Sequence, residues 1–261
     1  MKEKEILQSA YDYFLKILSE TSEEEVGFLP EFLSQKIYEY LVDVCGFNGL
    51  PKIVSNERFE ANPSIPIFHG FKKFEHGAEY LGDKDYHHGI GWTRGFFLTD
   101  KFKEAVTYTS FDNDNCLDDE KKVVKAKLVT GKIIDSEDLT VGQDAALNGY
   151  LKLLCEPSEE VSSKIEIFNS FVASIKSAYL KDLFMDSFVR VKSNLAVYLG
   201  FDVLLSKPKF RNTSRGNYYV VLNRSALSVP KTEFDRFNNK SRRSKNSQSV
   251  SQKGEVWYGK C

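Results

Sequence analysis

The chain has 261 residues, of which 41% are hydrophobic and 28% are charged, a composition that is ordinary for a soluble globular protein. This length suits one large domain, or one domain with a substantial appendage. The net charge is −1, no apolar stretch approaches the roughly 20 residues of a membrane-spanning helix, and the first residues lack the apolar core of a signal peptide, so we expect a cytoplasmic protein without a membrane segment.

Two amphipathic helices are expected at the start of the chain. Residues 3–19 place apolar side chains at helical spacing, and the stretch LPEFLSQKIYEYLVDVCGF repeats that pattern. Pro63 and Pro66 then interrupt the helical periodicity, and IPIFHGF is typical of a short strand that ends at a glycine. We therefore predict an N-terminal helical region at residues 1–50 and a second, α+β architecture at residues 51–230.

The remainder of this α+β region alternates strands and helices. GWTRGFFLTDKFKEAVTYT, at residues 91–109, indicates a short aromatic strand, a Thr-Asp turn and a helix. KVVKAKLVTGKIID alternates apolar and mostly basic side chains up to Gly131, which predicts a two-sided strand and a turn. Residues 135–199 contain three helical stretches, most of which should cover the sheet. The region closes with AVYLGFDVLLS, a polar loop and the strand YYVVLNRSALSV.

The end of the chain is basic. From Lys207 onward there are thirteen Lys and Arg residues and three Asp and Glu residues. A basic segment of this kind favours binding to phosphate groups or to an acidic partner. The alternative is a solvated tail without a binding role. Because residues 231–261 contain few apolar groups, we predict that they form a basic, flexible tail.

Several common nucleotide-binding and metal-binding patterns do not fit. The glycines of GIGWTRG, at residues 89–95, precede a strand and have the wrong spacing for a dinucleotide-binding loop. The four histidines, His69, His76, His87 and His88, lie close together in the sequence but without a second ligand at helical spacing, so we expect no metal. The four cysteines, Cys45, Cys116, Cys155 and Cys261, are scattered, which predicts reduced thiols.

Three side chains have both a structural and a functional interpretation. His69 lies between a strand-forming stretch and Gly70, where its ring could be presented at a strand end and the glycine could leave room for a ligand, or it could be a structural histidine. Phe97 and Tyr108, on a strand and the following helix, have positions that are typical of core residues. Their combination is what argues for function.

Three sequence blocks, taken in order, resemble the NAD-binding motifs of the ADP-ribosyltransferase superfamily. FHG at 68–70, GFFLTDKFKEAVTY at 95–108 and NYYVVLNRSAL at 217–227 are similar to motifs of its His-Tyr-Glu class, which includes diphtheria toxin and the poly(ADP-ribose) polymerases. LGFDVLL and YYVVLNR are also similar to blocks of phage-encoded members. The resemblance covers roughly residues 63–229 and implies a split, mixed or antiparallel β-sheet core with a helical insertion.

The resemblance implies that the chain consumes NAD as a substrate and needs no metal. His69 would hold the ribose of the nicotinamide half, and the main chain of Gly70 would pair with the carboxamide. Phe97, which replaces the usual Tyr, and Tyr108 would stack on the two faces of the pyridine ring. The implied cofactor-binding set is His69, Gly70, Gly95, Phe97, Thr99 and Tyr108.

Asn217 stands where the family carries its catalytic Glu. An amide can hydrogen-bond a ribose hydroxyl, but it supplies no negative charge to the cation that develops on the ribose. Either Asn217 replaces the Glu, or the third motif is aligned differently and another part of the chain brings a carboxylate.

The function implied by the resemblance is mono-ADP-ribosyl transfer by a cytoplasmic toxin or defence effector of a bacterium or phage, with a neutralising antitoxin as its partner. The loop before the third motif would recognise the acceptor macromolecule. Its basic and aromatic residues favour RNA or DNA over protein as the acceptor. These residues are Lys209, Phe210, Arg211 and Arg215. Two alternatives stay open: an NAD glycohydrolase, and a catalytically silent module that binds nucleic acid or a partner.

Overall fold

The computed structural model describes residues 2–21, 28–83, 95–109, 122–141, 150–189, 191–207 and 216–241. These residues form an α+β protein with both parallel and antiparallel strand pairs. The chain divides into two compact units. The first unit consists of Met1–Gly49, His87–Leu98 and Thr130–Ala226, and the second unit consists of Leu50–Tyr86, Thr99–Val129 and Leu227–Cys261.

The two units divide the chain differently from the predicted domains. The helical region predicted at residues 1–50 ends next to the boundary between Gly49 and Leu50, but it forms one unit with residues 130–226. The α+β region predicted at residues 51–230 is shared between the two units.

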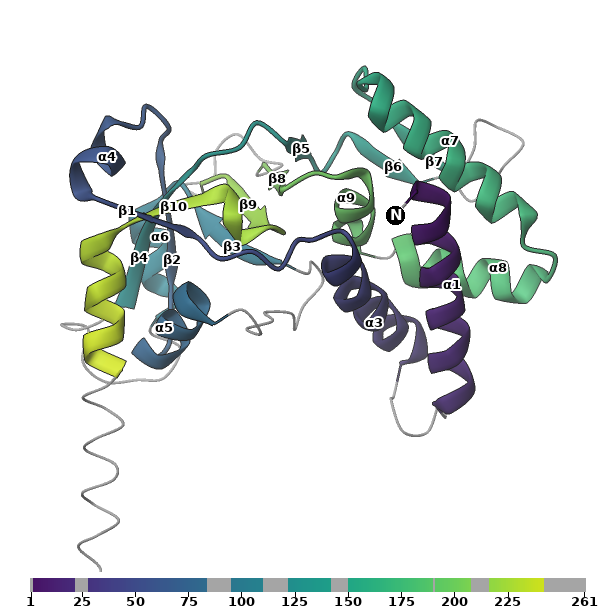
Figure 1. The fold of residues 1–261 in the computed structure, drawn as a ribbon, viewed down its shortest axis with the longest axis horizontal. Helices are drawn as coiled ribbons and strands as arrows, with labels where there is room; N and C mark the ends of the chain where they lie inside the picture. Colours follow the sequence, from purple (N-terminus) through teal and green to yellow (C-terminus); the bar gives the residue numbers. More distant parts are fainter. Residues whose placement is uncertain are drawn as a thin grey trace, which may run out of the picture. The chain divides into compact units, whose positions relative to one another are not determined.

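Helices dominate the first unit (Figure 1). They are α1 (Glu3–Glu20), α3 (Leu29–Val44), α7 (Glu159–Ser174), α8 (Ala178–Val189) and α9 (Lys192–Leu199). α3 packs against α1, α8 and α9, and α1 packs against α7. Their apolar stripes meet in a core of buried aromatic rings, where the ring of Phe184 lies 5.3 Å from those of Phe14 and Phe188. The helices predicted at the start of the chain and before residue 199 are confirmed.

The strands of the first unit lie in the order β3-β9-β8-β5. They are β3 (Phe96–Thr99), β9 (Tyr218–Val221), β8 (Val203–Ser206) and β5 (Ile133–Asp135). β8 is antiparallel to β9 and parallel to β5. A separate antiparallel pair, β6 (Leu139–Val141) and β7 (Leu151–Leu153), was not predicted from the sequence. The boundary between the two units falls inside β3, between Leu98 and Thr99.

The stretch YYVVLNRSALSV, which we predicted to be one strand, forms two. After β9 comes a 3₁₀ turn, η2 (Arg224–Ala226), and then β10 (Leu227–Pro230), which belongs to the second unit. Asp202 holds the chain before this turn, because its carboxylate accepts hydrogen bonds from Asn223 Nδ2 at 2.8 Å and from Thr130 Oγ1 at 2.5 Å. These side-chain bonds redirect the chain, although its apolar pattern continues.

The strands of the second unit lie in the order β1-β10-β4-β2. Besides β10, they are β1 (Lys52–Val54), β4 (Val123–Leu128) and β2 (Pro66–Gly70). β1 is parallel to β10, and the other pairs are antiparallel. Thr99 pairs with Phe68 along the other side of β2. Three short helices belong to this unit, α4 (Asn56–Ala61), α5 (Phe74–Gly82) and α6 (Phe102–Thr107), of which α6 packs on β2 and β4.

A fourth helix of the second unit spans 231–241 and differs from the flexible tail predicted there. Its Phe237 is fully buried, and a Cβ added to Gly77 of α5 would lie 2.3 Å from that ring. Arg236 Nη2 donates a hydrogen bond to the carbonyl of Val123 at 2.6 Å. This helix is therefore part of the folded unit, while residues 242–261 lie outside the described residues.

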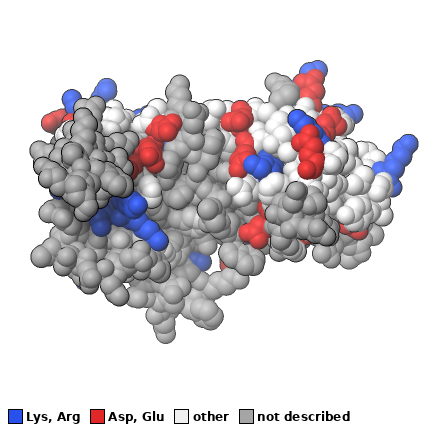
Figure 2. Space-filling model, turned by 90° about the horizontal axis from the view of Figure 1, so that it is seen from below, with Lys and Arg blue, Asp and Glu red and all other residues white. Residues whose placement is uncertain are grey.

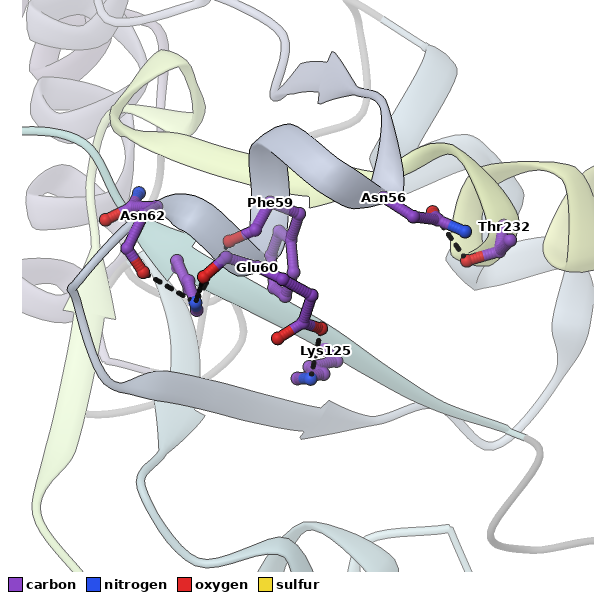
Figure 3. Close-up of polar contacts among 7 residues, drawn as sticks. Asn56, Phe59, Glu60, Asn62, Lys125 and Thr232 are labelled. Atoms are coloured by element: carbon purple, nitrogen blue, oxygen red, sulfur yellow. Dashed lines mark hydrogen bonds and ion pairs between the residues drawn. The ribbon is translucent and has the colours of Figure 1, made fainter.

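β4 carries a buried lysine. The strand predicted here is confirmed as β4, in which Val124 and Ala126 are buried. Lys127, on the other side of the predicted alternation, is also buried and is only 6% exposed. Its ammonium donates hydrogen bonds to the carbonyls of Phe59 at 3.0 Å and Asn62 at 2.7 Å, at the end of α4 (Figure 3). It also lies 4.9 Å from the centre of the Phe59 ring. The carbonyls and the ring replace the water that the charge loses.

The surface of the first unit carries charges of both signs. On the face drawn in Figure 2, Lys and Arg side chains are interspersed with Asp and Glu over the helices at the right of the picture. Ion pairs of this unit include Lys36–Glu39 at 2.9 Å and Lys207–Asp135 at 2.7 Å. Along the described stretches of the chain, no helix has both the length and the apolar character that crossing a bilayer requires.

Candidate functional site

Gly70 lets α6 pack closely on the end of β2. Phe68 packs edge-to-face on Phe102 of α6 at 5.5 Å, and a Cβ added to Gly70 would lie 2.1 Å from the carbonyl oxygen of Ala105. Any other residue at position 70 would push strand and helix apart. The missing side chain thus makes room for α6, whereas we predicted that it leaves room for a ligand.

His69 faces the opposite side of β2. Side chains alternate along a strand, so His69 points away from the face on which Gly70 meets α6. Its half-buried ring lies 4.7 Å from the ring of Phe71 in an edge-to-face contact. Phe71 in turn packs 5.4 Å from the ring of Phe237. An apolar, aromatic environment therefore supports one side of the imidazole.

Thr99 fixes the turn that leads into α6. It is 2% exposed and pairs with Phe68 across the β2–β3 ladder. Its hydroxyl accepts a hydrogen bond from the amide of Lys101 at 3.2 Å and donates one to Glu104 Oε2 at 3.1 Å. Tyr108 follows α6 as its C-terminal cap, and its side chain is 41% exposed. The strand, turn and helix predicted for this block are confirmed.

The first unit holds the other predicted residues. Gly95 has a positive φ of 126°, and a Cβ there would lie 2.7 Å from Val220 Cγ1 and 3.1 Å from the carbonyl oxygen of Val221, so this position excludes other residues. Phe97, in the middle of β3, is 39% exposed. Asn217 is half-buried and immediately precedes β9.

The predicted site residues therefore fall into two groups. The second unit holds Gly70, Thr99 and Tyr108 at the end of β2 and along α6, whereas the His69 ring lies on the opposite face of β2. The first unit holds Gly95 and Phe97 on β3 and Asn217 before β9. The predicted acceptor-binding residues, Lys209, Phe210, Arg211 and Arg215, lie outside the described residues, as do His87 and His88.

Sequence reasoning did not single out Glu104. It is half-buried on α6, is hydrogen-bonded to Thr99 and lies one helical turn before Tyr108. A glutamate in a helical stretch is usually a solvent-facing residue, so nothing in the pattern marked it. The pairing with Thr99, five residues earlier, becomes visible only once the turn is folded.

A separate cavity of about 400 Å³ lies within the first unit, where α1, α3, α7 and α9 converge, and none of the predicted site residues lines it. Cys45 and Lys164 are among its lining residues. Burial raises the pKa of the Cys45 thiol to about 11, against the opposing charge of Lys164. This thiol is therefore neutral at physiological pH and is a weak nucleophile.

The described residues contain no cluster of three or more His, Cys, Asp or Glu side chains that could hold a metal ion. In chemical terms, the end of α6 offers an exposed phenol ring at Tyr108, and one helical turn earlier the Glu104 carboxylate, which accepts a hydrogen bond from the buried Thr99 hydroxyl. An aromatic face next to a negative charge suits a planar, positively charged ring.

No protein-family model matches the chain, and neither the curated proteins nor the solved structures contain a match to it.

Proposed function

We propose that the chain is an NAD-dependent mono-ADP-ribosyltransferase with the fold of that superfamily, acting in the cytoplasm as a toxin or defence effector. One observation carries the proposal. α6, which leads to Tyr108, packs directly on the strand that ends in His69 and Gly70, so the first block and the part of the second block from Thr99 to Tyr108 are neighbours within one unit.

The exposure of Tyr108, the predicted stacking residue of the second unit, supports this proposal. Its side chain is 41% exposed, although aromatic residues are usually buried. An aromatic face at the surface can stack on a planar ligand ring. The pyridine ring of NAD is planar and cationic, so stacking on such faces gives both apolar contact and charge attraction.

The proposed reaction breaks the bond between the nicotinamide nitrogen and C1′ of the ribose. The bonding electrons leave with nicotinamide, and positive charge develops on the ribose ring. An oxygen or nitrogen of the acceptor then bonds to C1′ and gives its proton to water. The predicted basic loop before β9 favours RNA or DNA as the acceptor.

The test is to incubate the purified protein with NAD labelled in the ADP-ribose part and with cell lysate. Released nicotinamide is measured by chromatography, and the labelled products are digested separately with nuclease and with protease. We expect nicotinamide release together with nuclease-sensitive label. Protease-sensitive label would identify a protein acceptor instead.

Two histidine variants show whether the measured nicotinamide release comes from this protein or from a contaminating enzyme. His69→Ala should lower nicotinamide release about tenfold or more, because one lost ligand hydrogen bond is worth roughly 1 to 3 kcal/mol. His76→Ala, a change at an exposed histidine of α5, should leave it unchanged. If free ADP-ribose forms and no macromolecule is labelled, the protein is an NAD glycohydrolase and not a transferase. If no nicotinamide is released, both activities are refuted.

A further inference from the structure

The cavity of the first unit is lined by described residues of that unit alone. It has a volume of about 400 Å³ and lies where the N-terminal turns of α1 and α7 meet the ends of α3 and α9. Phe47, Val197 and Tyr198 in its wall are buried, whereas Gly46 and Lys132 are exposed. The cavity therefore combines an apolar, buried part with a rim that a small molecule can reach from solvent, and its volume lies in the range of small-molecule sites.

Several charges in the cavity wall are paired within the protein. Lys164 Nζ lies 3.0 Å from Glu160 Oε1 and donates a hydrogen bond to the carbonyl of Leu199 at 3.4 Å, at the end of α9. The Asp202 carboxylate accepts hydrogen bonds from two neighbouring side chains, an amide and a hydroxyl. These three charged groups are therefore stabilised without a ligand.

Two further lining charges, which are of opposite sign, have no such partner among the described residues. Glu3, in the first turn of α1, is half-buried, and its carboxylate forms no hydrogen bond or ion pair with another described residue. The same holds for the ammonium group of Lys132, just before β5. Charges in a partly enclosed site gain from a hydrogen-bonded partner of opposite sign. A ligand with one positive and one negative group could pair with both residues.

The end of α3 favours the positive group of such a ligand near Glu3. Cys45, the C-terminal cap of α3, lines the cavity, and the last carbonyl groups of a helix carry partial negative charge. Burial, and then the charges of Glu3 and Cys45, raise the pKa of Tyr198, so both residues lie near its hydroxyl. The Lys164 ammonium shows the same preference, because it bonds to a carbonyl at the end of α9.

We propose that this cavity binds a free amino acid with an apolar side chain. The ammonium group of the ligand pairs with Glu3 at the end of α3, and its carboxylate pairs with Lys132. Its side chain packs on the buried apolar part of the wall, at Phe47 and Val197. This site is separate from the predicted NAD-binding residues, none of which lines the cavity.

Calorimetry on the full chain, without NAD, tests the proposal with glycine, L-valine, L-leucine and L-methionine as separate probes. We expect L-leucine to bind with a dissociation constant below about 1 mM. Two analogues each carry one of its charges: isopentylamine lacks the carboxylate, and 4-methylpentanoate lacks the ammonium group. Each should bind about tenfold or more weakly than L-leucine, because one charged hydrogen-bonding partner is lost.

Two variants assign the charges of the ligand to residues. Glu3→Gln and Lys132→Met should each weaken L-leucine binding about tenfold or more. Lys132→Met should leave the binding of isopentylamine unchanged, and Glu3→Gln should leave that of 4-methylpentanoate unchanged, which a general loss of structure would not do. The matched controls, Glu20→Gln at the other end of α1 and Lys152→Met on β7, change exposed residues and should bind L-leucine as the wild type does.

Cys45 reports where the ligand binds, because its thiol lies in the cavity wall. Saturating L-leucine should slow the alkylation of Cys45 by iodoacetamide severalfold. The alkylation of Cys155, which is exposed and does not line the cavity, should keep its rate.

Three outcomes would overturn the proposal. If none of the four amino acids binds, the cavity is not a site for this class of ligand. If L-leucine binds without protecting Cys45, it binds elsewhere. If either analogue binds as tightly as L-leucine, the cavity does not recognise both charges. Because NAD is absent from these measurements, each outcome leaves the proposed function untouched.

Discussion

Lys127 is held in the second unit by acceptors that surround its ammonium. Its hydrogen bonds to the carbonyls of Phe59 and Asn62 and its contact with the Phe59 ring compensate for the loss of water. Lys127→Met keeps most of the aliphatic stem but leaves both carbonyls without this donor. We expect the free energy of unfolding, measured by urea denaturation, to fall by about 2 kcal/mol.

Lys125, two residues earlier on β4, is the matched control. Its ion pair with Glu60, at 3.1 Å, is largely solvent-exposed, and exposed pairs of this kind contribute roughly 0 to 1 kcal/mol. Lys125→Met should therefore destabilise the protein clearly less than Lys127→Met. Equal losses would show that the carbonyls around Lys127 do not hold its charge.

Cys45 gives a prediction about pH. Folding raises its pKa from 9.0 to about 11, so the folded state holds the thiol proton more tightly than the unfolded state. The resulting stabilisation is present below pH 9 and is lost as the pH rises through about 11. Alkylation of Cys45 by iodoacetamide, followed by peptide mass spectrometry, should be slow at pH 8 and should accelerate steeply between pH 9 and pH 11.

Cys155, an exposed thiol that follows β7, provides the comparison in the same protein. It should be alkylated well before Cys45 at pH 8, because the reagent reaches it directly. Equal rates for the two peptides at pH 8 would contradict the burial assigned to Cys45.

At the scale of elements, the helix at residues 231–241 completes the second unit. Phe237 fills the space beside Gly77 and Phe71 and is fully buried. Phe237→Ala should lower the free energy of unfolding by roughly 3 to 5 kcal/mol, measured by urea denaturation. The exposed Asn239→Ala should change it by less than about 0.5 kcal/mol. A Phe237→Ala variant as stable as the wild type would mean that this helix does not belong to the folded unit.

Sequence patterns predicted the elements whose apolar residues recur regularly. α1, α3, α7, β2 and β4 all follow from their spacing of apolar side chains. The helix at residues 231–241 was missed because a single buried aromatic, Phe237, anchors a segment whose overall composition is polar. The division of YYVVLNRSALSV was missed because the Asp202–Asn223 bond, which redirects the chain, joins residues from separate elements.

For the molecule as a whole, the sequence indicated the candidate site only through three short blocks. The resemblance placed His69 and Tyr108 in one site, and the second unit does bring their elements together. It did not indicate which face of β2 is covered by α6, and therefore did not indicate that Gly70, and not His69, meets this helix. Glu104 lies within the second block, but its pairing with Thr99 could not be predicted, because the hydrogen bond forms only across the folded turn.

The account depends on the pyridine ring of NAD stacking on Tyr108. The most direct measurement is the dissociation constant for NAD, determined by calorimetry for the wild type, for Tyr108→Ala and for Tyr179→Ala, which removes an exposed tyrosine of α8. The account predicts that Tyr108→Ala binds NAD about tenfold or more weakly, since stacking of an aromatic base is worth roughly 1 to 3 kcal/mol, while Tyr179→Ala binds as the wild type does. A wild type that does not bind NAD, or a Tyr108→Ala variant that binds it equally well, would contradict the account.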